Sequence, residues 1–167
     1  MRLSKRIALC GISAAFAALL ISFGNLVPLF DLSMYFFASI FVMLPISRGD
    51  LVGGVIVFIA AGLIGLFSAP NVIALLPYAI FFGSYPVFSA WLDRICPSRM
   101  VKWIPKILFF EVALFVLYRF TTLFLEGGVA VVTYPVLAIV GIAFLFLYDV
   151  ALEMAKRTLA RMTRKFF

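Results

Sequence analysis

The segment IALCGISAAFAALLISFGNLV, residues 7–27, contains no Asp, Glu, Lys or Arg. A helix needs about 20 predominantly apolar residues to cross the hydrocarbon core of a membrane, and this segment is long enough to do so. Arg2, Lys5 and Arg6 precede it, as basic residues precede the apolar region of a secretory signal peptide. Since the apolar stretch continues to Phe30 and is longer than such a region, we expect a retained first membrane helix.

The whole chain is unusually apolar. Of its 167 residues, 66% are hydrophobic and 13% are charged. A soluble domain has roughly 45–50% apolar and about 25% charged residues. The sequence therefore predicts an all-α, polytopic membrane helix bundle that forms a single domain over residues 1–167. The expected spans, about six, are 7–27, 32–46, 51–67, 72–92, 104–125 and 129–151, with a basic tail at 152–167. As an alternative, residues 32–67 hold one long span and a re-entrant piece.

The distribution of Lys and Arg orients these spans. The net charge is +7, but the basic residues lie beside apolar segments, so membrane topology explains them and no nucleic acid is expected as a partner. The outer loops carry only Asp31 and Glu126 as charged residues. Lys106 lies at the inner end of the fifth span, and Arg119 is the only other basic residue within a span. Because Lys and Arg accumulate in cytoplasmic loops, we expect both termini inside. The inside segments carry Arg2, Lys5, Arg6, Arg48, Arg94, Arg99, Lys102, Lys106, Lys156, Arg157, Arg161, Arg164 and Lys165.

Sequence signatures of enzymes are missing. The chain has no histidine, no GxxxxGK[ST] phosphate loop, no HExxH and no GxSxG, so we expect no enzyme, no cofactor and no metal site. Two acids, Asp149 and Glu153, lie one helical turn apart and are followed by Lys156 and Arg157. Since such spacings allow ion pairs along one helix, we expect a solvated interfacial helix end and not a catalytic dyad.

Small residues in the first segment suggest a close helix contact. Gly11 and Ala15 are four residues apart, as are Ala14 and Ala18, so each pair shares a helix face. Small residues let two membrane helices approach closely. The contact is either internal to this bundle or a docking face for a second membrane protein. Gly53, Gly54, Gly62 and Gly65 in the third segment predict close internal packing in the same way.

Polar side chains in the last three spans are candidate ligand-binding residues. Glu111 lies well inside an expected span, where an acid is costly and normally faces protein or water; it either pairs with Lys106 or contacts a ligand. Arg119 is the only cation of the outer half, and its planar guanidinium suits a carboxylate or phosphate. An ion pair with Glu126 or Asp31 is the alternative for Arg119.

Aromatic and amide side chains complete this candidate pocket. Asn71, Tyr78 and Tyr85 recur every seven residues along the fourth span, and Tyr134 lies in the sixth. Apolar pockets with a few converging polar groups are the usual form of small-molecule sites. We therefore expect an outer pocket with Arg119, Asn71, Tyr78, Tyr134 and Glu111 as its ligand-binding residues. Interfacial anchoring and interhelical hydrogen bonding are the alternative roles of the tyrosines.

Layout and the first-segment motif give the chain a family resemblance. It resembles the substrate-binding S components of energy-coupling factor transporters, which are small six-helix membrane proteins with an alanine-rich AxxxA-type motif in the first helix. Ala14 and Ala18 match that motif, with Gly11 and Ala15 as a second candidate. The segments Asn71–Leu76 and Phe81–Pro86 are also similar to a group of small uncharacterised bacterial membrane proteins.

The resemblance implies partners and a location. It implies a vitamin or micronutrient ligand, a membrane coupling subunit, cytosolic ATPases supplied by other chains, and a bacterial plasma membrane as the site of action. It names no substrate. The competing hypotheses are a membrane assembly or envelope protein that acts through helix contacts, and a small self-contained transporter or channel.

Overall fold

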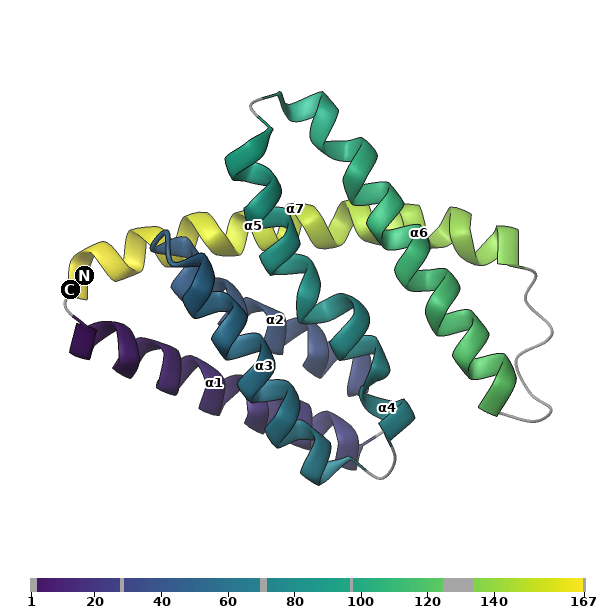
Figure 1. The fold of residues 1–167 in the computed structure, drawn as a ribbon, viewed down its shortest axis with the longest axis horizontal. Helices are drawn as coiled ribbons and strands as arrows, with labels where there is room; N and C mark the ends of the chain where they lie inside the picture. Colours follow the sequence, from purple (N-terminus) through teal and green to yellow (C-terminus); the bar gives the residue numbers. More distant parts are fainter. Residues whose placement is uncertain (1–2, 28, 70–71, 97, 125–133, 167) are drawn as a thin grey trace.

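The computed structural model describes residues 3–27, 29–69, 72–96, 98–124 and 134–166, and within these ranges the chain is helical, with no strand. Figure 1 shows that the N-terminal end of α1 (Leu3–Leu26) and the C-terminal end of α7 (Tyr134–Phe166) lie at the same end of the molecule. Residues 129–133, the expected start of the sixth span, lie outside the described residues.

Helices α1, α2 (Asp31–Ser47) and α3 (Leu51–Ser68) pack together into the most compact part of the fold. Their shared core contains Ala17, Ile21, Val42, Val57 and Ala61, each fully buried. The close packing predicted for the third segment is confirmed at two glycines. A Cβ atom on Gly54 would overlap the side chain of Ile46, and one on Gly65 would overlap Ile21.

A tight turn joins α2 to α3. Gly49 adopts a φ of 81°, in the left-handed region that glycine enters at little cost. Asp50 follows it and caps α3, because its side chain accepts a hydrogen bond of 2.8 Å from the Gly53 amide. The guanidinium of Arg6, on α1, donates through Nη2 to Asp50 Oδ1 at 2.8 Å and through Nε to the other carboxylate oxygen. These contacts tie the start of α1 to the turn.

The fourth apolar segment is a broken helix. It consists of α4 (Val72–Pro77), a π-helical turn η1 (Tyr78–Phe82) and α5 (Ser84–Ile95). The amide of Gly83 donates to the carbonyl of Tyr78 at 2.8 Å, which is the i→i+5 spacing of a π-turn. Proline removes a backbone donor, so Pro77 and Pro86 interrupt the α-helical ladder on both sides of this turn. Such breaks are tolerated within membranes where neighbouring groups satisfy the freed backbone atoms.

The two last helices are long and sparsely covered. Helix α6 spans Arg99–Phe124, and α7 has 33 residues, about 50 Å at the helical rise per residue. On α7 only Leu145, Tyr148 and Leu152 are buried among the side chains that the structure describes. Both helices also carry exposed apolar residues, among them Ile104 and Leu108 on α6 and Ile139 and Leu147 on α7. Figure 1 shows α7 running across the whole molecule.

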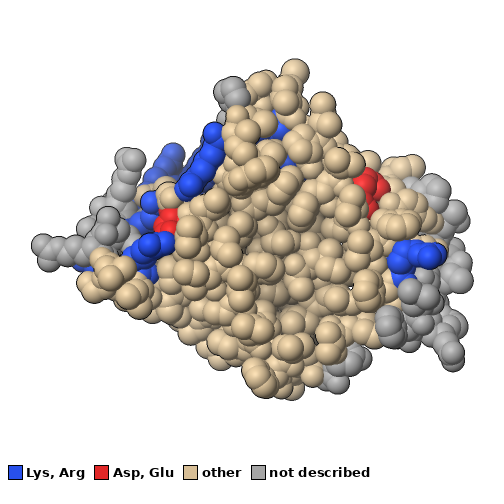
Figure 2. All heavy atoms as spheres, viewed as in Figure 1, with Lys and Arg blue, Asp and Glu red and all other residues tan. Residues whose placement is uncertain are grey.

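Four helical stretches of the described chain are long and apolar enough to cross a membrane: Leu3–Leu26, Leu51–Ser68, Val72–Ile95 and Val136–Arg161. Helix α2 is apolar but shorter, at 17 residues. In Figure 2 the Lys and Arg side chains of this face gather mainly toward the end where the chain termini lie, and most of the remaining face carries no charge. A folded chain with so much exposed apolar surface fits lipid as its solvent, so the protein is a multi-pass helical membrane protein.

Candidate functional site

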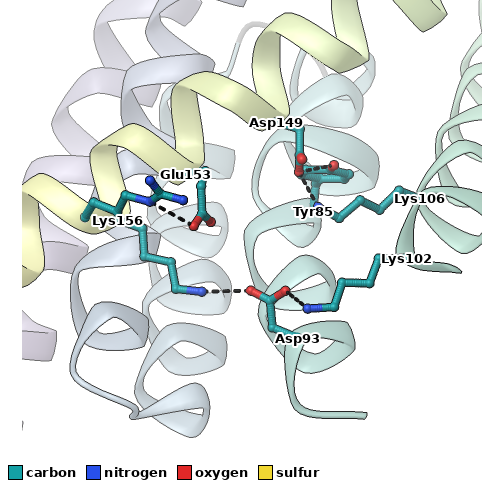
Figure 3. A network of polar contacts seen from close by, with 8 residues as sticks. Tyr85, Asp93, Lys102, Lys106, Asp149, Glu153 and Lys156 are labelled. Carbon is teal, nitrogen blue, oxygen red and sulfur yellow. Dashed lines mark hydrogen bonds and ion pairs between the residues drawn. The ribbon is translucent and has the colours of Figure 1, made fainter. Parts of the chain in front are cut away.

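A charged cluster lies between α5, α6 and α7, and we call it the basic-end network. At the more solvent-exposed edge of the network, Asp93 of α5 accepts two hydrogen bonds of 2.8 Å, one at each carboxylate oxygen. The donors are Lys102 of α6 and Lys156 of α7. Figure 3 shows the two lysines reaching Asp93 from opposite sides. One carboxylate therefore links three helices and holds two ammonium groups.

A second carboxylate completes the network deeper in the fold. Asp149, on α7, accepts from the Lys106 ammonium at 2.6 Å and from the Tyr85 hydroxyl at 2.7 Å. The side chains of Lys106 and Asp149 are only 10% and 15% exposed, so this ion pair is shielded from solvent. Lys106 also lies 5.6 Å from the centroid of the Trp103 ring, a cation–π distance.

The solvent-exposed end of α7 begins at Glu153, one turn after Asp149, around which the sequence predicts it. Glu153 and Arg157 form the expected i,i+4 pair at 3.2 Å, and both side chains are about half exposed. For Asp149 the expectation is wrong, because α5 and α6 cover it and supply its partners. Lys156 pairs with Asp93 and not with an acid of its own helix.

A cavity of about 510 Å³ opens beside this network. Its walls combine charged side chains with apolar ones, so it offers ammonium and guanidinium groups next to hydrocarbon. Such a lining suits the binding of a charged group that carries an apolar part, and it contains no nucleophile activated by a neighbouring base. The lining residues are Asp93, Lys102, Trp103, Lys106, Asp149, Val150, Glu153, Met154 and Arg157.

Two of the ligand-binding candidates predicted from the sequence meet in the structure. The Tyr134 hydroxyl, at the start of α7, donates to Glu111 Oε2 on α6 at 3.0 Å. Tyr118 lies one heptad after Glu111, on the same helix face, and its ring centroid is 5.6 Å from that of Tyr134. The second carboxylate oxygen, Glu111 Oε1, is buried and has no hydrogen-bond partner among the described residues. Lys106, the alternative partner of Glu111, is bound to Asp149 instead.

The remaining candidates lie apart from this pair or outside the described residues. Arg119 is exposed on α6, and Asn71 lies outside the described residues. Tyr78 lies in the π-turn, fully buried, with its ring 6.0 Å from those of Tyr35 and Phe58. Its hydroxyl has no hydrogen-bond partner in the described part of the chain.

The small residues of α1 divide between two faces. Ala18 is 4% exposed and belongs to the internal core, and Ala14 packs against that core. Gly11 and Ala15 are exposed, and no atom of the described chain outside α1 lies within 4 Å of a Cβ built on Gly11. Gly11 and Ala15 are therefore the pair that is exposed on the surface of the protein.

Sequence reasoning missed two polar clusters. The sequence gives Lys102 a role in topology only, offers Glu111 as the partner of Lys106, and gives Asp93 no role. The approach of these residues to α7 depends on how α5 and α6 fold back. The other cluster joins Asn25 to the Gly65 carbonyl at 3.1 Å and brings the Tyr35 hydroxyl within 2.7 Å of Asn25 Oδ1. The only sequence signal for that cluster is an amide near the end of an apolar helix.

Comparison of this chain with protein-family models, curated proteins and solved structures gives no match.

Proposed function

We propose that this protein is a membrane-embedded substrate-binding subunit of an importer of the energy-coupling factor type, with a vitamin or other micronutrient as ligand. The observation that carries the proposal is the buried carboxylate oxygen Glu111 Oε1, which has no hydrogen-bond partner among the residues that the structure describes. A buried acceptor without a donor is costly, so a native structure normally supplies a partner. A bound ligand with an N–H, ammonium or hydroxyl donor is such a partner for Glu111 Oε1.

The surroundings of Glu111 support a ligand site. Tyr134 holds one carboxylate oxygen and leaves the other available. The rings of Phe115 and Tyr118 each contact the ring of Tyr134, whose hydroxyl is bound to Glu111. Flat aromatic surfaces next to a few polar atoms are typical of sites for small ring-containing molecules.

The exposed face of α1 supports a membrane partner. A helix that presents Gly11 and Ala15 outward allows a second helix to approach closely, and close approach is the main source of helix contacts in lipid. The chain carries no phosphate loop, so transport energy in this proposal comes from partner ATPases. The proposal includes six spans, both termini in the cytoplasm of a bacterium, and the network of α5–α7 at the cytoplasmic surface.

A ligand screen tests the binding role. Purified protein is exposed to a panel of vitamins, and thermal unfolding identifies ligands that raise the midpoint. For any such ligand we expect Glu111→Gln to weaken binding about ten- to a hundred-fold, as for the loss of a charge-assisted hydrogen bond. Arg161→Gln, far along α7, is the matched control and should bind as wild type. Equal affinity of Glu111→Gln and wild type would remove Glu111 from the site.

The orientation is tested separately by cysteine labelling of intact cells, in a background with Cys10 and Cys96 replaced. A cysteine at Asp31 should react with an impermeant reagent, and one at Arg48 should react only after the cells are opened. Labelling of the Arg48→Cys variant in intact cells would contradict the proposed orientation.

A further inference from the structure

The basic-end network contains more positive than negative charge. Lys102, Lys106, Lys156 and Arg157 supply four cations, whereas Asp93, Asp149 and Glu153 supply three carboxylates. The surplus lies where two ammonium groups share Asp93. Each lysine ammonium has three donors, and one donor of each is used on Asp93. Within the described part of the chain, the shared site therefore keeps unused donors and one positive charge without a carboxylate of its own.

We infer that the cavity beside this network binds the phosphate group of an anionic phospholipid. One phosphodiester carries one negative charge, which matches the surplus, and its oxygens accept from the unused donors of Lys102 and Lys156. Arg157 lines the same cavity and is 59% exposed, so its guanidinium is available to a phosphate oxygen at the rim. This inference does not depend on the proposed ligand site at Glu111, which belongs to a different part of α6.

The apolar part of the lining favours a lipid over a free anion. Trp103, Val150 and Met154 line the cavity together with the charged groups. Tryptophan is enriched at the depth of lipid headgroups, and its ring here is stacked on Phe146 at 5.5 Å. A soluble phosphate would gain nothing from these hydrocarbon surfaces.

Helix α7 beside the cavity also provides a path for acyl chains. Leu147 on α7 is 68% exposed. It lies two turns before Met154, a residue of the cavity wall, and on the same helix face, so it extends the apolar part of the lining along α7. Basic pockets between membrane helices on the cytoplasmic side are known to bind anionic headgroups, because headgroup charge and acyl chains are both accommodated.

Native mass spectrometry of the purified full-length protein in detergent tests the inference. The probes are dioleoylphosphatidylglycerol, dioleoylphosphatidylcholine and inorganic phosphate. We expect one phosphatidylglycerol per chain at low concentration and at least tenfold weaker binding of phosphatidylcholine. Equal binding of the two lipids would overturn the requirement for an anionic lipid. Thermal unfolding compares phosphatidylglycerol with inorganic phosphate. If both raise the unfolding midpoint equally, the cavity is a free-anion site and the inference is overturned.

Variants locate the lipid. Lys102→Gln combined with Lys156→Gln and Asp93→Asn removes the surplus charge and keeps neutral hydrogen-bonding groups in place of the three charged ones, so the fold has no unpaired charge. We expect this variant to lose phosphatidylglycerol binding at least tenfold, and Arg157→Gln alone, at an exposed position, to weaken it. Arg161→Gln, one turn further along α7, should bind as wild type. Unchanged binding by the triple variant, or the same loss with Arg161→Gln, would overturn the inference.

Discussion

The hydroxyl of Tyr148, on α7, donates a hydrogen bond of 3.1 Å to the carbonyl oxygen of Phe82 at the end of the π-turn. In an α-helix this carbonyl would receive the amide of residue 86, but Pro86 has no N–H. On the other side of the turn, the Tyr35 hydroxyl of α2 lies 2.8 Å from the carbonyl of Ala74. Tyrosines of two neighbouring helices therefore support the broken helix on either side of its π-turn.

Replacement of Tyr148 by Phe should destabilise the protein. The change keeps the ring but removes the donor of the Phe82 carbonyl, which costs about 1–3 kcal/mol when the group stays buried. Tyr78→Phe is the matched control. The Tyr78 hydroxyl is buried and has no hydrogen-bond partner among the described residues, so its removal should be neutral or stabilising. Denaturant titrations of both variants in detergent measure the difference. Equal losses in the two variants would contradict the role of the Tyr148 hydrogen bond.

The sequence predicted the positions of helices better than the contacts between helices. The segments expected at 7–27, 32–46 and 51–67 correspond to α1, α2 and α3, because long apolar stretches and the polar residues between them reflect local chemistry. The sequence did not predict the π-turn at Tyr78–Phe82, since its stability depends on hydroxyl groups from α2 and α7. The count of six spans and the orientation stay predictions.

Removal of Lys106 should leave a buried charge without its partner. In Lys106→Met only the Tyr85 hydroxyl still contacts Asp149, and loss of one member of a buried ion pair costs about 3–5 kcal/mol. The further change Asp149→Leu removes the stranded charge and should recover most of the lost stability. Thermal unfolding of the single and double variants measures this. A double variant less stable than Lys106→Met would contradict the account.

The contact between Arg6 and Asp50 predicts a pH dependence. Burial alone would raise the pKa of Asp50, but hydrogen bonds from Arg6 and the Gly53 amide outweigh it and lower that pKa below its ordinary value of 3.8. A carboxyl with a lowered pKa stabilises the fold above its ordinary pKa and loses that contribution as the pH falls through the lowered value. As the pH falls below about 4, the free energy of unfolding of wild type should therefore decrease more steeply than that of Asp50→Asn. Parallel curves for the two proteins would refute this.

The two faces of α1 should respond differently to added volume. Leucine at Ala18 would enter the internal core and should lower the unfolding temperature in detergent, since overpacking costs about 1–3 kcal/mol. Leucine at Gly11 meets open space and should leave the isolated protein at least as stable, because glycine disfavours helices. Circular dichroism melts of both variants compare them. A large loss of stability in Gly11→Leu would mean that this face is packed internally.

The candidate site was predicted in part. An acid within an apolar helix drew attention to Glu111, and the structure places Tyr134, another candidate, on it. The role of Asp93 was not predicted, since a single acid among basic residues looks like an ordinary cytoplasmic loop until α6 and α7 bring Lys102 and Lys156 to it. Contacts between residues more than 60 positions apart depend on the packing of helices, which no local pattern records.

Co-purification tests the central claim most directly. The tagged protein is isolated in mild detergent from the cells that naturally express it, alongside Gly11→Leu, and the retained proteins are identified by mass spectrometry. The account predicts that wild type retains a large membrane coupling subunit together with cytosolic ATPases, and that Gly11→Leu folds but retains them at least tenfold less. Recovery of wild type with no ATPase, or with a membrane partner that has no transport subunits, would contradict the importer and favour an assembly protein.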